Sequence, residues 1–171
     1  RVTATGEWTW REVVAESAVR AAWLSSALDP DRPPNIGLLL GNTADYVFTV
    51  FGAALAGACV VGINSTRRGA ELQRDIAHTD CQFVLTDSSH PGLLDSGART
   101  LRVDDQPWSS SAGASLPAAL PDPTSLLLLI FTSGSTSAPK AVKRSSGRIA
   151  AAASLGFSPD DTIYISMPLI H

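Results

Sequence analysis

Hydrophobic residues recur along the first half of the chain in two alternating patterns. Between Trp10 and Leu28 they are spaced as on one face of an α-helix, whereas three later runs are apolar throughout and are separated by stretches with helical spacing. We expect a helix from Trp10 to about Leu28. The expected strands cover Ile36 to Leu40, Cys59 to Ile63 and Gln82 to Thr86, and the helices between them cover about Ala44 to Ala56 and Gly69 to His78.

This alternation of strands and helices predicts βαβ units and a parallel sheet. Strands covered by helices on both faces are apolar at every position rather than at every second one, as these runs are. A further run, Leu126 to Phe131, is the most apolar in the chain and is expected to form a central strand. The predicted fold class is therefore α/β, with parallel βαβ sheet layers covered by helices.

Local signals mark the ends of the helices. Thr9 and Glu12 have the spacing of a capping box, in which each side chain accepts a backbone N–H of the first turn. Three prolines between residues 29 and 34 end the first helix, because proline lacks an N–H and clashes with the preceding turn. Either Asn42 or Thr43 is expected to cap the second helix.

The helical spacing also indicates which faces are buried. In the third helix, Leu72 and Ile76 are expected to point inward. Trp8 and Trp10 are expected to pack the first helix against the sheet. The apolar stripe of that helix consists of Trp10, Val14, Ala21, Leu24 and Leu28.

The composition changes between about residues 104 and 125, where serine, glycine and proline are frequent. We expect a surface connection of about 20 residues, which is long for a loop inside a compact domain. It is interpreted as an excursion between two segments of the sheet, and its mobility stays open.

The overall composition excludes several classes of protein. The 171 residues are 44% hydrophobic with a formal net charge of −3, so a folded core is expected and a basic surface for nucleic acid is not. Two cysteines, Cys59 and Cys81, are too few for a disulfide scaffold, which favours the cytoplasm. The apolar stretch 47–63 contains three glycines and is short for a membrane span, so we expect no integral membrane segment and leave peripheral association open.

The segment Thr132 to Lys140 follows the most apolar run and combines hydroxyl side chains, one glycine and a lysine. Gly134 permits a tight turn, and successive backbone N–H groups and hydroxyls form a concave set of donors for an anion. Lys140 adds a positive charge, and its neighbour Lys143 is the only other lysine beside eleven arginines. Spacing alone leaves two readings open, phosphate binding and a flexible polar turn. The candidate phosphate-binding residues are Thr132, Ser133, Gly134, Ser135, Thr136, Ser137 and Lys140.

Other motifs for nucleotides or nucleophiles are absent from the sequence. The Walker pattern, G-x-S-x-G and G-x-G-x-x-G do not occur. Ser137 to Lys140 matches the S-x-x-K of penicillin-binding proteins, but neither S-D-N nor K-T-G accompanies it. His78 and Cys81 are too few for a zinc site, so no metal ligand is expected within this chain.

Two motifs resemble those of the adenylate-forming superfamily, which includes acyl-CoA synthetases. The first is Phe131 to Val142, FTSGSTSAPKAV, which is similar to the AMP-binding signature [FY]-T-S-G-[ST]-T-G-x-P-K-G-V. The second is Tyr164 to His171, which is similar to Y-x-x-x-P-L-F-H. The stretch Asn35 to His90 resembles the fatty-acyl-CoA ligase branch. The resemblance implies that residues 1–171 are an incomplete N-terminal portion of the large domain of such an enzyme, consistent with a chain that opens on Arg1.

The resemblance implies a reaction in two steps. ATP activates a fatty or other carboxylic acid as an acyl-adenylate, and coenzyme A then displaces AMP. By the same likeness, the loop Thr132 to Lys140 holds the ATP phosphates, Lys140 stabilises the charge of the departing pyrophosphate, and His171 lies near the acyl substrate. A Mg²⁺-binding glutamate and a second catalytic lysine are implied outside this chain. We therefore expect that the chain alone is inactive, and that its uncovered apolar surface promotes self-association.

Two departures from the signature keep alternatives open. Ser137 and Ala141 stand where the family usually has glycine, so the loop is strained if either position needs a positive φ and unaffected otherwise. Alternatives within the superfamily are a fatty-acyl-AMP ligase and an adenylation domain that loads a carrier protein. An alternative of another class is a degenerate module that binds nucleotide weakly or serves as an interaction surface.

Overall fold

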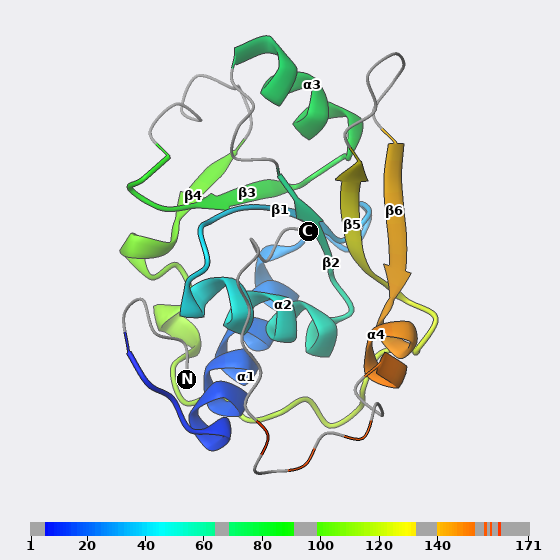
Figure 1. The fold of residues 1–171 in the computed structure, drawn as a ribbon. Coiled ribbons are helices and arrows are strands. Elements are labelled where there is room, and N and C mark those ends of the chain that lie inside the picture. Colours follow the sequence, from blue (N-terminus) through cyan, green and yellow to red (C-terminus); the bar gives the residue numbers. More distant parts are fainter. Residues whose placement is uncertain are drawn as a thin grey trace.

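A computed structural model describes residues 6–63, 69–90, 99–132, 140–152, 156, 158 and 161. Helices and strands alternate through the first half of the chain, as expected, and a hairpin of two strands follows (Figure 1). The elements are α1 (Trp10–Ala27), β1 (Asn35–Leu39), α2 (Ala44–Ala56), β2 (Cys59–Gly62), α3 (Gly69–His78), β3 (Phe83–Thr86), β4 (Thr100–Arg102), η2 (Val103–Asp105), η3 (Ser109–Ser111), β5 (Leu126–Thr132), β6 (Lys140–Ser145) and α4 (Ser146–Ala152).

The strands form one sheet in the order β4-β3-β1-β2-β5-β6. All neighbouring pairs from β4 to β5 are parallel, which confirms the predicted parallel sheet, whereas β6 pairs with β5 in the antiparallel direction. β5 is an interior strand between β2 and β6, as its apolar sequence predicted. The antiparallel strand β6, the short strand β4 and the helix α4 were not predicted.

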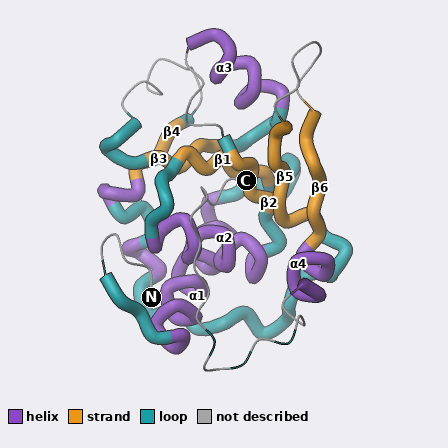
Figure 2. Tube along the Cα trace, in the orientation of Figure 1, coloured by secondary structure: helices purple, strands orange, loops and turns teal. Residues whose placement is uncertain are grey.

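The sheet lies between helices on its two faces (Figure 2). Successive side chains of a strand point to opposite faces. On β3, Phe83 joins the core that includes Trp23 and Leu24 of α1, whereas Val84 packs with Leu72 and Ile76 of α3. The inward orientation predicted for Leu72 and Ile76 is therefore confirmed.

The predicted helix ends are also confirmed. Thr9 and Glu12 form the capping box of α1, in which Oε2 of Glu12 accepts the Thr9 backbone N–H at 2.7 Å. Thr43, rather than Asn42, caps α2 by accepting the Tyr46 backbone N–H. Gly57 ends α2 with φ of 73°, a left-handed conformation that glycine adopts without the steric cost of a Cβ.

A glycine determines how closely α1 and α2 cross. A Cβ atom added at Gly52 of α2 would lie 2.5 Å from Cβ of Arg20 and 3.0 Å from the carbonyl oxygen of Ser17. These distances leave no room for a larger residue. The two helices therefore pack backbone to backbone at this point.

Two expectations need correction. Trp10 does not pack α1 against the sheet, because its side chain is 77% exposed; Trp8 does pack, edge to face on Phe48 with ring centroids 5.6 Å apart. The connection 104–125 is not only a surface excursion. It contains the 3₁₀ turns η2 and η3, and Trp108 between them is buried against Trp23 of α1.

Candidate phosphate-binding site

The candidate loop joins the two strands of the β5–β6 hairpin. Thr132, the last residue of β5, is the register partner of Lys140, the first residue of β6. Of these two residues the structure describes the backbone only. The other candidate residues, Ser133, Gly134, Ser135, Thr136 and Ser137, and the substrate-pocket candidate His171, lie outside the described residues.

The hairpin continues beyond the neighbouring parallel strand. Val60, Val61 and Gly62 of β2 pair with β5 as far as Ile130, and the register that follows pairs Phe131 with Ala141 and Thr132 with Lys140. The end of β5 is a carboxyl end, so it lies at the same edge as the ends of β1, β2 and β3. Crevices at this edge are where open parallel sheets bind ligands. The fold therefore brings the start of the candidate loop to the edge where a binding site is expected.

The departure at Ala141 is explained by its place in the hairpin. Ala141 lies within β6, pairs with Phe131, and is not one of the residues with positive φ. Because an extended backbone accepts any side chain, alanine adds no strain there. The other departure, Ser137, lies outside the described residues.

A polar turn follows β3 at the same edge of the sheet. One carboxylate oxygen of Asp87 accepts the backbone N–H of Ser89 at 2.9 Å and lies 2.9 Å from Nδ1 of His90. Burial of Asp87 opposes its ionisation, but the hydrogen bonds from Ser89 and His90 outweigh burial and keep its pKa below the usual value. The backbone N–H of Ser88 donates to Asp104, which ties this turn to η2. His90 is thus a loop histidine held by its own turn.

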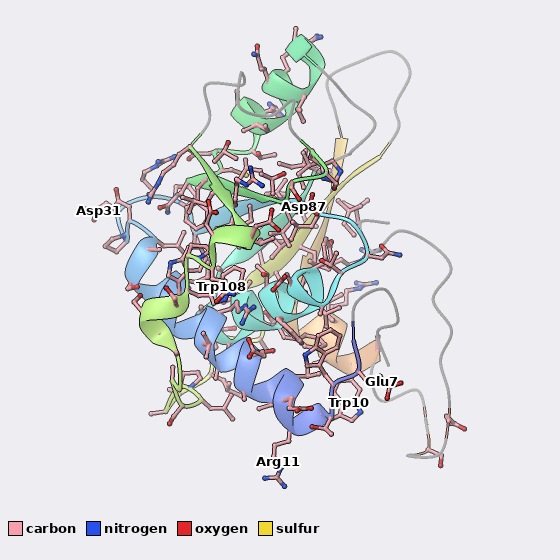
Figure 3. The ribbon with its side chains drawn as sticks, turned by 90° about the vertical axis from the view of Figure 1, so that its left-hand side faces the viewer. Glu7, Trp10, Arg11, Asp31, Asp87 and Trp108 are labelled. Atoms are coloured by element: carbon pink, nitrogen blue, oxygen red, sulfur yellow. The ribbon has the colours of Figure 1, made fainter. Side chains whose placement is uncertain are left out.

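A charge cluster centred on the buried Arg20 of α1 was not predicted from the sequence. Its guanidinium contacts Glu16, donates to Asp45 of α2 at 2.8 Å and stacks on the Trp108 ring at 3.9 Å from the centroid. The cluster lines a cavity of about 310 Å³ together with Asp104 (Trp108 is labelled in Figure 3). The i, i+4 spacing of Glu16 and Arg20 was the available signal in the sequence. The carboxylates of Glu16 and Asp45 neutralise the guanidinium, so the cluster does not present a free cation. Its contacts instead join α1, α2 and the 103–108 segment.

The two cysteines are neither paired nor activated. Cys59 is buried at the first residue of β2, and Cys81 lies partly buried two residues before β3. Burial raises the pKa of Cys59 to about 12 and that of Cys81 to about 11. Both thiols are therefore protonated at neutral pH and are poor nucleophiles. At these positions the two cysteines serve as small packing residues.

No group of three or more histidine, cysteine, aspartate or glutamate side chains is arranged to hold a metal ion in the part of the chain that the structure describes. Among the same residues, no helix has both the length and the apolar character that crossing a membrane requires.

Comparison with known proteins finds several relatives that are coenzyme A ligases or synthetases by name. The chain is 45% identical to steroid-22-oyl-CoA synthetase of Rhodococcus jostii, over 96% of this chain and 32% of that protein. It is 39% identical to a medium/long-chain-fatty-acid–CoA ligase of Mycobacterium marinum, over 95% of this chain and 34% of that protein. Among solved structures, O-succinylbenzoate coenzyme A synthetase of Bacillus subtilis in complex with AMP matches with a TM-score of 0.82 and 25% identity, over 99% of this chain and 46% of that one.

The chain spans about a third of the length of the curated relatives that it matches. The family model named AMP-binding enzyme matches residues 2–171, which is nearly every residue. The sheet, the hairpin that carries the signature loop, and these matches agree with one another. The chain belongs to the AMP-binding enzyme family.

Proposed function

We propose that the full-length protein is an acid–thiol ligase that converts a fatty or related carboxylic acid into its coenzyme A thioester at the expense of ATP. The relatives named above are ligases of this kind, acting by name on a steroid acid and on medium- and long-chain fatty acids. Residues 1–171 are, in this proposal, an incomplete N-terminal portion of the large domain, with the 104–125 connection inside it.

The observation that carries the proposal is the β5–β6 hairpin. It holds the signature loop between two register partners, Thr132 and Lys140, at the carboxyl edge of a parallel sheet. The strands thus fix both ends of the loop at the edge where open parallel sheets bind ligands, and this is where the proposal requires donors for the phosphates.

The proposed reaction assigns each partner a role. A carboxylate oxygen of the acid attacks the α-phosphorus of ATP, the bond to the β-phosphate oxygen breaks, and pyrophosphate leaves. The thiol sulfur of coenzyme A then attacks the acyl carbonyl, and AMP leaves as the thiol proton is released. The loop residues Thr132 to Ser137 bind the ATP phosphates, and the ammonium of Lys140 offsets the charge that grows on pyrophosphate. His171 borders the acyl substrate.

Mg²⁺ enters the proposal with ATP and is held by residues outside this chain. The two free cysteines support a cytoplasmic location. Residues beyond these 171 determine whether the acyl group is accepted by coenzyme A or by a carrier protein. They also determine the length of the acyl chain.

The test compares the two lysines of the chain in the full-length protein. Lys140→Ala is expected to weaken ATP binding by about 1.5–3 kcal/mol, or roughly 10- to 150-fold, and to reduce pyrophosphate release. Lys143→Ala removes the same charge from an exposed position three residues later in β6 and is expected to leave both nearly unchanged. Equal ATP affinity in wild type and Lys140→Ala would reject the proposal and favour a degenerate, non-catalytic module.

A further inference from the structure

The two halves of α1 differ sharply in burial. Ala21 and Leu24 of its apolar stripe are 3% and 0% exposed, whereas Trp10 and Val14 of the same stripe are 77% and 45% exposed. None of residues 10–16 is fully buried. About 10 Å of helix, at 1.5 Å per residue, thus lies beyond the elements that cover the rest of α1.

The exposed and buried residues belong to one face of the helix. At 100° per residue, Trp10, Val14, Ala21 and Leu24 fall within about 40° of a common line. The line that faces α2 and the sheet in the second half of α1 therefore continues, uncovered, along the first half. Trp8, two residues before α1, packs its ring on the buried Phe48 of α2.

Isolated apolar side chains on a surface are common and need no explanation. This pair differs because a tryptophan and a valine four residues apart extend the core stripe without a break. The capping box also specifies a helical start for a segment in which no residue is more than partly buried. Helical turns without packing are marginal in water, so this start would gain from a partner that covers it.

We propose that the Trp10–Val14 face of α1 docks against the part of the full-length ligase that lies outside residues 1–171. The proposal rests on the proposed function in one respect, that this chain is a portion of a longer ligase. The matched relatives are about three times as long as this chain. In a ligase of that length, the remaining two thirds of the polypeptide are covalently linked to α1 and offer a large surface for it to contact. Exposed charged residues, Glu7 and Arg11, border the face, as polar rims border apolar interfaces (Figure 3). Glu7 and Glu12, both exposed, make an anionic lipid surface a poorer partner.

The first experiment uses two double variants of the full-length ligase. Trp10→Ser with Val14→Ser removes the apolar face, and Arg11→Ser with Ala15→Ser introduces the same residue one position later on the helix, where both side chains are exposed. Helix propensity alone would make the second variant the less stable one, because arginine and alanine form helices better than serine, whereas tryptophan and valine are close to serine. The docking proposal predicts that the first variant melts at least about 4 °C lower than the second. Equal melting temperatures overturn it.

The second experiment measures the accessibility of Trp10 and does not depend on folding of a disruptive variant. Acrylamide quenching is compared between the full-length ligase and its Trp10→Phe variant. If Trp10 is covered, its fluorescence is weakly quenched, and the wild type shows no strongly quenched component that the variant lacks. If the wild type does show such a component, the proposal is overturned. Concentration-dependent protection of Trp10, seen with dimerisation by sedimentation, would assign the face to a second copy and also overturn it.

These outcomes separate the two proposals. A protein that releases no pyrophosphate but protects Trp10 contradicts the proposed function and retains the docking face. An active ligase in which Trp10 is freely quenched contradicts only the docking face.

Discussion

The helices α1 and α2 pack against each other on one face of the sheet, yet they begin in different surroundings. Each starts with a threonine N-cap and has an acidic residue in its first turn. In α2 burial begins at once, with Ala44, Tyr46 and Phe48 all buried. In α1 no residue is fully buried before Ser17.

The two helices show that helix formation and burial are separate properties, although a single sequence pattern is often used to predict both. Capping signals and helical spacing act over four residues, and they specify a helix in both places. Burial depends on elements that are distant along the chain. Buried residues occur in α2 from its first residue, Ala44, but in α1 only from Ser17 onward. The difference predicts unequal effects of similar substitutions, which we give in order of size.

The largest contrast is expected between two apolar residues of the α1 stripe. Leu24→Ala leaves a cavity in the core under β1 and should cost about 2–5 kcal/mol of unfolding free energy. Val14→Ala removes a half-exposed side chain and improves helix propensity, so the 171-residue chain should lose less than about 0.5 kcal/mol. Urea denaturation measures both, and equal losses would show that Val14 is buried within this chain.

The crossing of α1 and α2 gives an effect of intermediate size. Gly52→Ala places a Cβ against Arg20 and Ser17 and should destabilise the chain by about 1–3 kcal/mol through overpacking. Gly41→Ala is the matched control, because an added Cβ there has no heavy atom within 4 Å, and it should change stability by less than about 0.5 kcal/mol. A tolerated Gly52→Ala, by the same denaturation measurement, would mean that the helices cross less closely.

The smallest contrast concerns the two N-caps. Thr43→Ala should cost about 1 kcal/mol, because the first turn of α2 is buried and cannot fray alone. Thr9→Ala removes a better-bonded cap, with reciprocal hydrogen bonds to Glu12, but should cost less than about 0.5 kcal/mol in the isolated chain because the first turns of α1 open locally. Circular dichroism would record that loss of helix. A larger global cost for Thr9→Ala would contradict the difference drawn between the two helices.

Much of the fold was predictable where local chemistry and tertiary packing agree. The predicted bounds of α2 and α3 coincide with the structure, and β1, β2 and β3 were each predicted to within one residue at either end. The strands are mainly apolar, α2 has a capping threonine, and α3 carries Leu72 and Ile76 at helical spacing. β4 has three residues and β6 reads Lys-Ala-Val-Lys-Arg-Ser, so neither carries the apolar run by which a buried strand is recognised.

The candidate site was predictable in a different way. The residues of the loop are recognised from their order in the sequence, and the strand that leads to it, β5, from its apolar character. The antiparallel return through β6, which makes Lys140 the partner of Thr132 and makes Ala141 harmless, was not predictable. The Arg20 cluster was missed for the same reason, because Asp45 and Trp108 approach Arg20 only after the chain has folded.

By itself, the sequence determined the extents of α1, α2 and α3, the four apolar strands β1, β2, β3 and β5, and the loop that carries the signature, because each of these depends on residues within a few positions of one another. Only the tertiary structure decided the antiparallel partner of β5, the burial of Trp108, and the point along α1 where its apolar face loses cover. Burial requires surfaces from distant parts of the chain to come together, and a local sequence pattern does not identify the distant segment that covers a given residue.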